Sequence, residues 1–353
     1  MILRRYVVSS TGLAMAGTTL LLLLLQLIFA YIAELGNLTE HYRPLQAVGY
    51  VLWSMPEYLY ELLPITALMG SVVGLGLLAG EGALTVMRAS GVSLWRIVGW
   101  TLWPASVLLV LNLLLSESII PYTSQQAASV RDPSVSLRQG EVQGHWVRQQ
   151  ARLLYVQRAT ATGQIFGVQL LDFDPQGRLL QTLTAQTGHY QQGQVWHLQQ
   201  VQVVQLATSG VATRTVHPSV DLALPLQPRW IHVATQSPEL LAPSTLWPYG
   251  QHLQAQGETL PRTFRLALWQ KLTAPLGLAA LVILACSFIF GSLRQQTMGL
   301  RLVTALFVGL GFRYLQDFLG YVSLLFQGAI GWFILLPILL TALLGVFLLH
   351  RHR

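Results

Sequence analysis

Six long apolar runs constrain this chain more than any other feature of its sequence. A helix needs about 20 apolar residues without charge to cross a bilayer, and runs near that length recur along the 353 residues. Only 10% of the residues are charged, against about 25% in an average soluble domain. We therefore predict six membrane spans: Leu13–Ala33, Tyr58–Ala79 with its apolar run from Pro64, Ile97–Leu115, Leu272–Ser292, Leu302–Leu325 and Ile330–Leu349.

The start of the chain resembles a secretory signal, because Arg4 and Arg5 precede the first apolar run. The apolar core is too long for a signal peptide, however, and no convincing A-x-A cleavage site follows it. We therefore expect the first span to be retained as a membrane anchor.

Arginine is divided unequally between the two sets of span ends. Eight arginines lie at one set, where Glu81 alone opposes them: Arg4, Arg5, Arg88, Arg96, Arg294, Arg301, Arg351 and Arg353. The other short connections hold four glutamates against Arg43: Glu34, Glu40, Glu57 and Glu61. Because short cytoplasmic loops are enriched in Lys and Arg, both termini are predicted to be cytoplasmic. The formal net charge of +7 mostly reflects this bias and does not indicate a nucleic-acid-binding surface.

The same rule places a long polar insert, residues 121–265, outside the cytoplasm. From Arg131 onward, short runs alternate between apolar and polar residues, separated by turn sequences such as Asp-Pro-Gln-Gly, and no helical pattern appears before about Pro243. Regularly spaced short strands are typical of an all-β sandwich or roll. We thus expect residues 1–120 to hold three spans, 121–265 a β domain and 266–353 the last three spans.

No motif in the sequence supports catalysis, metal binding or nucleotide binding by this chain. The nine histidines show no ligand spacing, and the single cysteine, Cys286, excludes an intrachain disulfide or a cysteine-based zinc site. Asp172 and Asp174 flank Phe173 at a turn, where a turn-forming or solvated role is far commoner than a catalytic pair. The glycines of Gly74–Gly80 lie inside a span, which favours close helix packing over a nucleotide loop. Because no P-loop motif is present, we expect any ATP hydrolysis, and any cofactor, to belong to a partner.

Glu81 and two arginines stand in the glycine-punctuated segment GEGALTVMRASGVSLWR, from Gly80 to Arg96. The pattern predicts a short helix at Ala83–Ala89, ended by Gly91. Apolar residues would then rest against the membrane while charged ones face outward: Leu84, Met87 and Ala89 against Glu81 and Arg88. Such a helix could be gripped by a soluble motor protein, or it could be an amphipathic linker whose arginines only obey the charge bias.

Five motifs resemble those of the LptF/LptG (YjgP/YjgQ) family of lipopolysaccharide-export permeases, and of its LptG-type members in particular. They are RRY at Arg4–Tyr6, PITALMGSVVGLGLLA at Pro64–Ala79, LTVMRASG at Leu84–Gly91, WQKLTAPL at Trp269–Leu276 and SFIFGSLRQQTMGLRLVT at Ser287–Thr304. The similarity extends over nearly the whole chain and is weakest in the β insert.

The resemblance implies a permease subunit of an ABC transporter in the bacterial inner membrane, with a periplasmic β-jellyroll domain between two groups of three spans. Lipopolysaccharide would be its substrate. Its partners would be an LptF-type permease, an LptB-type ATPase dimer, LptC and an LptA-type periplasmic bridge. The short helix would be the coupling helix that contacts the ATPase, through Glu81, Leu84, Met87 and Arg88.

Two departures from the family pattern affect these residues. The family's coupling glutamate falls on Ala83, and Glu81 lies two residues earlier, roughly 200° away around a helix. Either the residues before the helix are non-helical and Glu81 reaches the ATPase from there, or that salt bridge is absent. The basic residues that relatives carry near the first span are missing, at Ala30, Gly36 and Asn37, whereas Arg131 matches a family basic position.

A lipopolysaccharide site needs an apolar wall and cations at the level of the headgroup phosphates, which guanidinium binds bidentately. We predict that Arg131, Lys271 and Arg313 surround the outer mouth of a cavity between the first and fifth spans and their counterparts in the LptF-type partner. Its lining would be Leu24, Leu27, Phe29, Phe307, Phe312 and Leu315. Two alternatives stay open: Arg313 pairs with Asp317 on its own helix, and Lys271 is a snorkelling interfacial anchor.

Two other functions fit the same sequence. The chain could be an LptF-type paralogue, or a permease of the same layout for another lipid. It could instead be a membrane-anchored scaffold whose β domain recruits partners without any transport.

Overall fold

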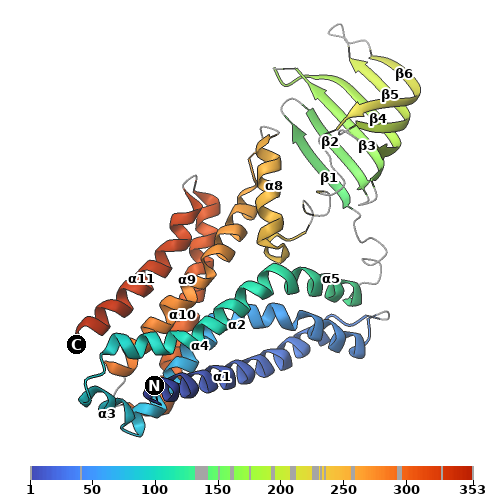
Figure 1. The fold of residues 1–353 in the computed structure, drawn as a ribbon. Helices are drawn as coiled ribbons and strands as arrows, with labels where there is room; N and C mark the ends of the chain where they lie inside the picture. The colour runs from blue at the N-terminus through green and yellow to red at the C-terminus, as the bar shows by residue number, and fades with distance from the viewer. Residues whose placement is uncertain are drawn as a thin grey trace. The chain divides into compact units, whose positions relative to one another are not determined.

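A computed structural model of the chain divides into two units (Figure 1). It describes residues 2–39, 42–131, 142–149, 152–159, 163–174, 176–191, 195–206, 212–224, 230, 233, 236–255, 259–291, 296–326 and 329–351. The membrane unit comprises residues 1–131, 242–244 and 261–353, and the β unit comprises residues 132–241 and 245–260. The membrane unit therefore continues past the boundary expected at residue 120, and its second part begins before residue 266.

Six helices in the described part of the chain are long and apolar enough to cross a membrane, which confirms the six predicted spans. They are α1 (Ile2–Leu35), α2 (Pro44–Gly80), α4 (Leu94–Leu114) continued by α5 (Ile120–Arg131), α9 (Arg262–Phe290), α10 (Met298–Leu325) and α11 (Ile330–Arg351). A π-helical turn at Leu115–Ile119 joins α4 to α5, so the third span is longer than its apolar run suggests.

Helices α2 and α9 form the centre of the membrane unit. In each of them 67% of the most apolar stretch is buried, against 11% in α1 and 22% in α10. Their buried leucines and alanines pack into one apolar cluster with residues of α4 and α11. Cys286 is fully buried in this cluster, where it serves as a small apolar core residue.

Glycines in α2 allow α1 to lie directly against its backbone. A Cβ atom added to Gly74 would lie 2.6 Å from the Cα atom of Thr11, and one added to Gly70 would collide with Met15 in the same way. The prediction that these glycines serve close helix packing is therefore confirmed at Gly74. At Gly80 no described atom would lie within 4 Å of such a Cβ, so packing does not require that glycine.

The β unit contains a six-stranded antiparallel sheet whose strands lie in chain order, which confirms the predicted β insert. The strands are β1 (Val142–Gln149), β2 (Arg152–Ala159), β3 (Gln164–Phe173), β4 (Leu179–Tyr190), β5 (Val195–Leu206) and β6 (Ala212–Ala223). One face carries the apolar core, in which Trp196, Leu198 and Val156 are fully buried. After the strands come a 3₁₀ turn at Pro238–Leu240 and helix α8 (Pro243–Ala255), which begins where the helical pattern was expected.

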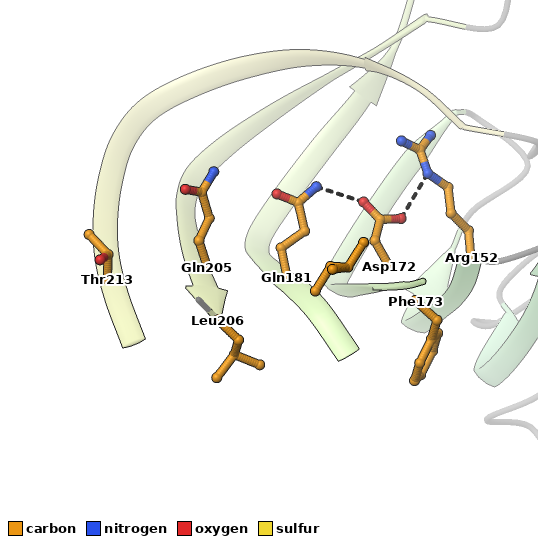
Figure 2. Close-up of a pocket in the computed structure, with 8 residues that line it drawn as sticks. Arg152, Asp172, Phe173, Gln181, Gln205, Leu206 and Thr213 are labelled. Atoms are coloured by element: carbon orange, nitrogen blue, oxygen red, sulfur yellow. Dashed lines mark hydrogen bonds and ion pairs between the residues drawn. The ribbon is translucent and has the colours of Figure 1, made fainter. Parts of the chain in front are cut away.

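The turn between β3 and β4 is organised by Asp174, as predicted. Its Oδ1 accepts hydrogen bonds from the backbone amides of Gln176 and Arg178, at 3.0 and 2.7 Å, and Gly177 adopts a φ of 81°. These bonds, that from the Arg178 amide above all, lower the pKa of Asp174. The turn role predicted for Asp172 is wrong: it lies within β3, nearly buried, and its carboxylate bonds to Arg152 and Gln181 (Figure 2).

Candidate functional site

The segment between α2 and α4 folds as predicted into a short helix, α3 (Ala83–Ala89). Two glycines separate it from its neighbours, because both adopt the left-handed conformation that favours residues without a Cβ atom. Gly82 has a φ of 73° and Gly91 a φ of 90°. The amide of Val92 donates to the carbonyl of Met87, which closes the C-terminal end of the helix.

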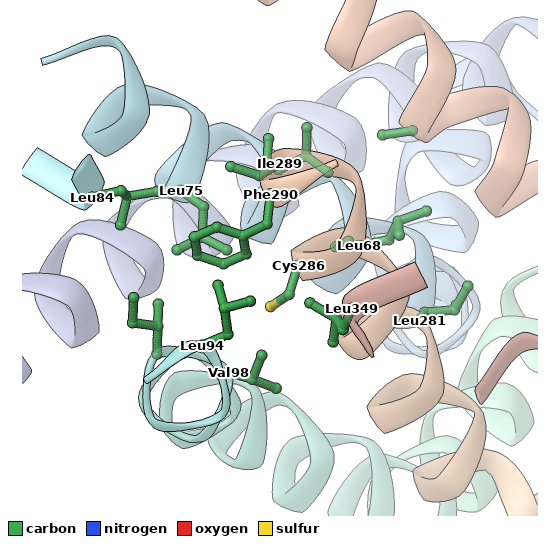
Figure 3. Close-up of a cluster of buried hydrophobic side chains, with 14 of the residues drawn as sticks. Leu68, Leu75, Leu84, Leu94, Val98, Leu281, Cys286, Ile289, Phe290 and Leu349 are labelled. Atoms are coloured by element: carbon green, nitrogen blue, oxygen red, sulfur yellow. The ribbon is translucent and has the colours of Figure 1, made fainter. Parts of the chain in front are cut away.

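Leu84 and Met87 of α3 pack into the protein, so the expectation that they rest against the membrane is wrong, whereas Ala89 is exposed. Leu84 and Met87 are 4% and 2% exposed and belong to the same cluster as Leu94 and Phe290 (Figure 3). A contact between these two side chains and an ATPase therefore has no support in this structure. The opposite side of α3 presents Val86, which is 68% exposed, and Arg88, one turn after Leu84, is also exposed. Sequence reasoning passed over Val86, although its position between two inward-facing residues marks it as outward.

Glu81 follows the last residue of α2 and is not part of α3, because Gly82 interrupts the helical path. The Tyr6 hydroxyl in α1 donates a hydrogen bond of 2.8 Å to Glu81 Oε2. Glu81 therefore lies outside the helical path of α3. This is what the first alternative requires, in which Glu81 reaches the ATPase from a non-helical segment before the helix. Tyr6 was noted only as part of the RRY motif, and its link to Glu81 was not foreseen.

A buried arginine connects the beginning of α10 to α2. Arg301, 7% exposed, donates from Nη1 to the backbone carbonyl of Gly76 at 3.1 Å. A Cβ on Gly76 would lie 3.2 Å from that nitrogen, so the glycine leaves the space that the guanidinium occupies. The sequence indicates Arg301 as part of the charge bias and of the Ser287–Thr304 motif, and the structure gives it an additional packing role.

Arg313 joins α10 to α2, which the sequence did not predict. Its Nη2 lies 3.1 Å from Glu61 Oε2, and its Nη1 donates to the Glu61 carbonyl at 3.1 Å. Asp317 is a second and more distant partner, with 3.8 Å between Nε and Oδ2. The alternative of an ion pair contained within one helix is therefore incomplete, because the shorter contacts run between helices.

The other two predicted headgroup cations lie in different surroundings. Arg131, at the end of α5, has its Nε 3.2 Å from Glu34 Oε1 and its guanidinium 5.4 Å from the ring centre of Tyr50. It thereby links α5 to the C-terminal end of α1 and the N-terminal part of α2. Lys271 is only 6% exposed within α9, so it is not a snorkelling anchor and does not line an open mouth in this structure.

Most of the predicted cavity lining is available on α1 and α10. Leu24, Phe29, Phe307 and Leu315 are 52, 59, 71 and 39% exposed, and Leu27 is half-buried. Phe312 is the exception: it is 8% exposed and packs in the core, where its ring would meet a Cβ on Gly277 at 3.4 Å. Its assignment as a cavity residue is wrong, because the apolar pattern of α10 does not distinguish its inner from its outer face.

Comparison with known proteins agrees with this architecture. The family model described as "Lipopolysaccharide export system permease LptF/LptG" matches residues 5–351. The Lipopolysaccharide export system permease protein LptG of Escherichia coli K12 is 29% identical, with 92% of this chain and 91% of that protein aligned. The protein of the same name from Haemophilus influenzae is also 29% identical, with 99% of each chain aligned. From its six spans, its inserted β sheet and a family match over almost its entire length, this chain belongs to the LptF/LptG family of lipopolysaccharide export permeases.

Proposed function

We propose that this chain is one permease subunit of a lipopolysaccharide exporter. It would pair with an LptF-type permease, and an LptB-type ATPase dimer would supply the energy. Family membership and the names of the LptG relatives support the substrate. In this proposal the protein lies in the bacterial inner membrane, with both termini and α3 cytoplasmic and the β unit periplasmic, as the arginine bias indicates.

The observation that supports this role most directly is the exposure of α1 and α10. Both pack on α2, and both are the least buried of the spans. Their exposed apolar side chains, among them Phe29 and Phe307, need an apolar neighbour. A second permease that contributes equivalent helices would enclose a chamber whose walls suit acyl chains, with α1, α2 and α10 forming this chain's half.

Two arginines would contact lipid phosphates at this chamber. Arg131 and Arg313 have side chains that are 46% and 35% exposed. Arg131 pairs with the carboxylate of Glu34, and Arg313 pairs with that of Glu61 and more distantly with that of Asp317. A guanidinium has five N–H donors, so each arginine retains donors for a phosphate while paired. Lys271 would join them only after its helix surroundings open, since it is buried.

Transport would then couple ATP binding in the partner to the width of the chamber. Closure of the ATPase dimer would move α3, and with it α2 and α4, which it connects. Narrowing of the chamber would expel the lipid toward LptC and an LptA-type bridge. Because a ligand shifts an equilibrium only by binding one state better, the wide state must bind lipopolysaccharide more tightly than the narrow state.

Reconstitution tests this proposal. The chain is co-expressed with LptF-type and LptB-type partners, placed in liposomes with lipopolysaccharide, and assayed for transfer to an LptA-type acceptor. We expect transfer that requires ATP and all three proteins, and no ATP hydrolysis by this chain alone. Transfer with an LptG-type partner in place of the LptF-type one would reassign the chain as the paralogue. Assembly without ATP-dependent transfer would favour the scaffold and overturn the proposal.

A further inference from the structure

Helix α4 carries an exposed stripe that begins at an arginine and continues as apolar side chains. The stripe consists of Arg96, Trp103, Val107, Val110 and Leu114, whose spacing along the chain places them on one face of the helix. Arg96 is exposed, and the four others are 56, 61, 53 and 54% exposed in that order. The apolar part of such a stripe suits an acyl chain, and the arginine at its end suits the headgroup of the same molecule.

An open step interrupts the stripe between its arginine and its aromatic ring. Gly99 lies between Arg96 and Trp103 on the same face of α4. It is exposed, and no described atom would lie within 4 Å of a Cβ atom added to it. From the rise of a helix, the Cα atoms of Arg96 and Trp103 are separated by about 10 Å along the axis. A small group that rests on Gly99 would therefore lie between a cation and a ring.

Helix α1 brings a second cation to that ring. It packs against α4 where a Cβ atom on Gly12 would lie 3.3 Å from Pro104 Cβ. The guanidinium carbon of Arg4 lies 5.4 Å from the centre of the Trp103 ring. A guanidinium in such a cation–π contact keeps N–H donors for an anion. The open step at Gly99 thus has one arginine before it on α4 and another beside the ring that follows it.

The arginines at this end of α1 and α4 are exposed and are not neutralised by a described carboxylate. The ion pairs found among the described residues involve other cations and do not reach Arg4, Arg5 or Arg96. Glu81, the acidic residue that precedes α3, accepts a hydrogen bond from Tyr6. Because arginines at a membrane surface attract anionic lipids, positive charge beside an apolar stripe favours an amphiphile with a negative headgroup.

We propose that an anionic phospholipid binds here, with its phosphate on Gly99 between Arg96 and Arg4 and one acyl chain along the apolar part of the stripe. Guanidinium groups suit this phosphate because they can bind it bidentately. We call Arg4, Arg96, Gly99 and Trp103 the headgroup site. The ligand is a lipid of the surrounding membrane and not the exported substrate, since the proposed orientation puts the site in the cytoplasmic leaflet. Binding requires neither ATP nor a partner, so its failure and a failure of transport are distinguishable.

Quenching of Trp103 fluorescence by brominated lipids tests the site. The full-length chain is placed in phosphatidylcholine nanodiscs in which a small fraction of the lipid is replaced by phosphatidylglycerol or phosphatidylcholine with brominated acyl chains. The difference between the parent protein and Trp103→Phe isolates the signal of Trp103. We expect this signal to report a preference for phosphatidylglycerol of about fivefold or more, which salt should reduce.

Three substitutions and two matched controls define the residues, and each is measured with and without Trp103→Phe. Arg4→Gln and Arg96→Gln should each lower the preference about fivefold, as expected for one arginine near an anionic lipid. Gly99→Leu should abolish it without a change of charge, because the side chain fills the open step.

The controls repeat these changes elsewhere in the membrane unit. Arg351→Gln removes another exposed arginine, at the end of α11, and Gly80→Leu adds the same side chain at another open glycine. Neither should alter the preference. Comparison of two lipids on the same variant cancels any direct effect of Arg4 on the emission of Trp103. Circular dichroism of each variant verifies that the helices are folded.

Four results would overturn the proposal. Equal quenching by the two lipids would show that the site does not select a negative headgroup. An equal effect of Arg351→Gln and Arg96→Gln would assign the preference to overall charge. An unchanged preference in Gly99→Leu would show that no headgroup lies on the open step. Protection of Trp103 from both lipids by an added LptF-type partner would identify this face as a protein interface. Loss of ATP-dependent lipopolysaccharide transfer with the preference intact would instead count against the proposed function and leave the headgroup site standing.

Discussion

The hydroxyl of Tyr6 lies 2.8 Å from Glu81 Oε2 and joins the beginning of α1 to the end of α2 immediately before α3. Glu81 is exposed, and only one of its oxygens is engaged by this bond. The carboxylate is thus held in place beside α3 while it retains an acceptor for a second partner.

Substitution of these two residues separates orientation from direct contact. Glu81→Ala should weaken binding of an LptB-type ATPase about fivefold, as expected for loss of one solvent-exposed ion pair. Tyr6→Phe should change the affinity less than twofold, because the carboxylate remains. Binding is measured with the permease pair in nanodiscs. If the Glu81→Ala variant binds the ATPase as tightly as the parent protein, Glu81 forms no salt bridge with the ATPase.

Val86 and Leu84 should respond in opposite ways. Val86→Asp places a charge on a side chain that is 68% exposed, so it should abolish ATPase association with little change in thermal stability. Leu84→Ala removes a buried side chain and should destabilise the membrane unit by about 2–5 kcal/mol. Co-purification and thermal unfolding of the same preparations provide the two readouts. Normal ATPase binding by Val86→Asp would exclude this side of α3 as the docking surface.

Gly74→Ala should destabilise the protein through the contact between α1 and α2. The new methyl group would lie 2.6 Å from Thr11 Cα, and such overpacking costs about 1–3 kcal/mol. Gly80→Ala is the matched control, because no described atom lies within 4 Å of the added carbon. Thermal unfolding in detergent should show a lower Tm for the first variant and an unchanged or higher Tm for the second. Equal Tm values would contradict the close packing described for Gly74.

A double-mutant cycle should reveal the link between Arg313 and Glu61. Both side chains are partly exposed, so a coupling free energy of about 0.5–1 kcal/mol is expected between Arg313→Gln and Glu61→Gln. Asp317→Asn in place of Glu61→Gln should give a smaller coupling, since its contact is 3.8 Å. Unfolding free energies of the single and double variants measure both values. A larger coupling with Asp317 would restore the interpretation of an ion pair within one helix.

Features with a local cause could be predicted from the sequence. The six spans follow from uninterrupted apolar runs, and the bounds of α3 follow from Gly82 and Gly91, which must adopt positive φ. The turn role of Asp174 follows likewise from a carboxylate that bonds to amides two and four residues later. Each of these depends on neighbours within one turn or one helix.

The partners of the charged residues could not be predicted in the same way. Arg313 and Glu61 are 252 positions apart, and Arg301 and Gly76 are 225 apart, so only the packed helices bring them together. Leu84, Met87 and Phe312 were misplaced for a related reason. An apolar side chain satisfies the sequence pattern equally well against lipid or against protein, and only the fold distinguishes the two. The side-by-side placement of Arg152, Asp172 and Gln181 likewise depends on strand register, which alternation alone does not determine.

The π-helical turn at Leu115–Ile119 has a consequence for Arg131. Its wider loop is closed by the amide of Ile120, which donates to the carbonyl of Leu115, five residues back. One surplus residue of this kind rotates everything that follows by about 100° relative to a regular helix. The third span therefore has two angular phases, one on each side of the turn. In the second phase the side chain of Arg131 points toward Glu34 and Tyr50. In an uninterrupted helix its guanidinium would lie about 100° around the helix axis from both.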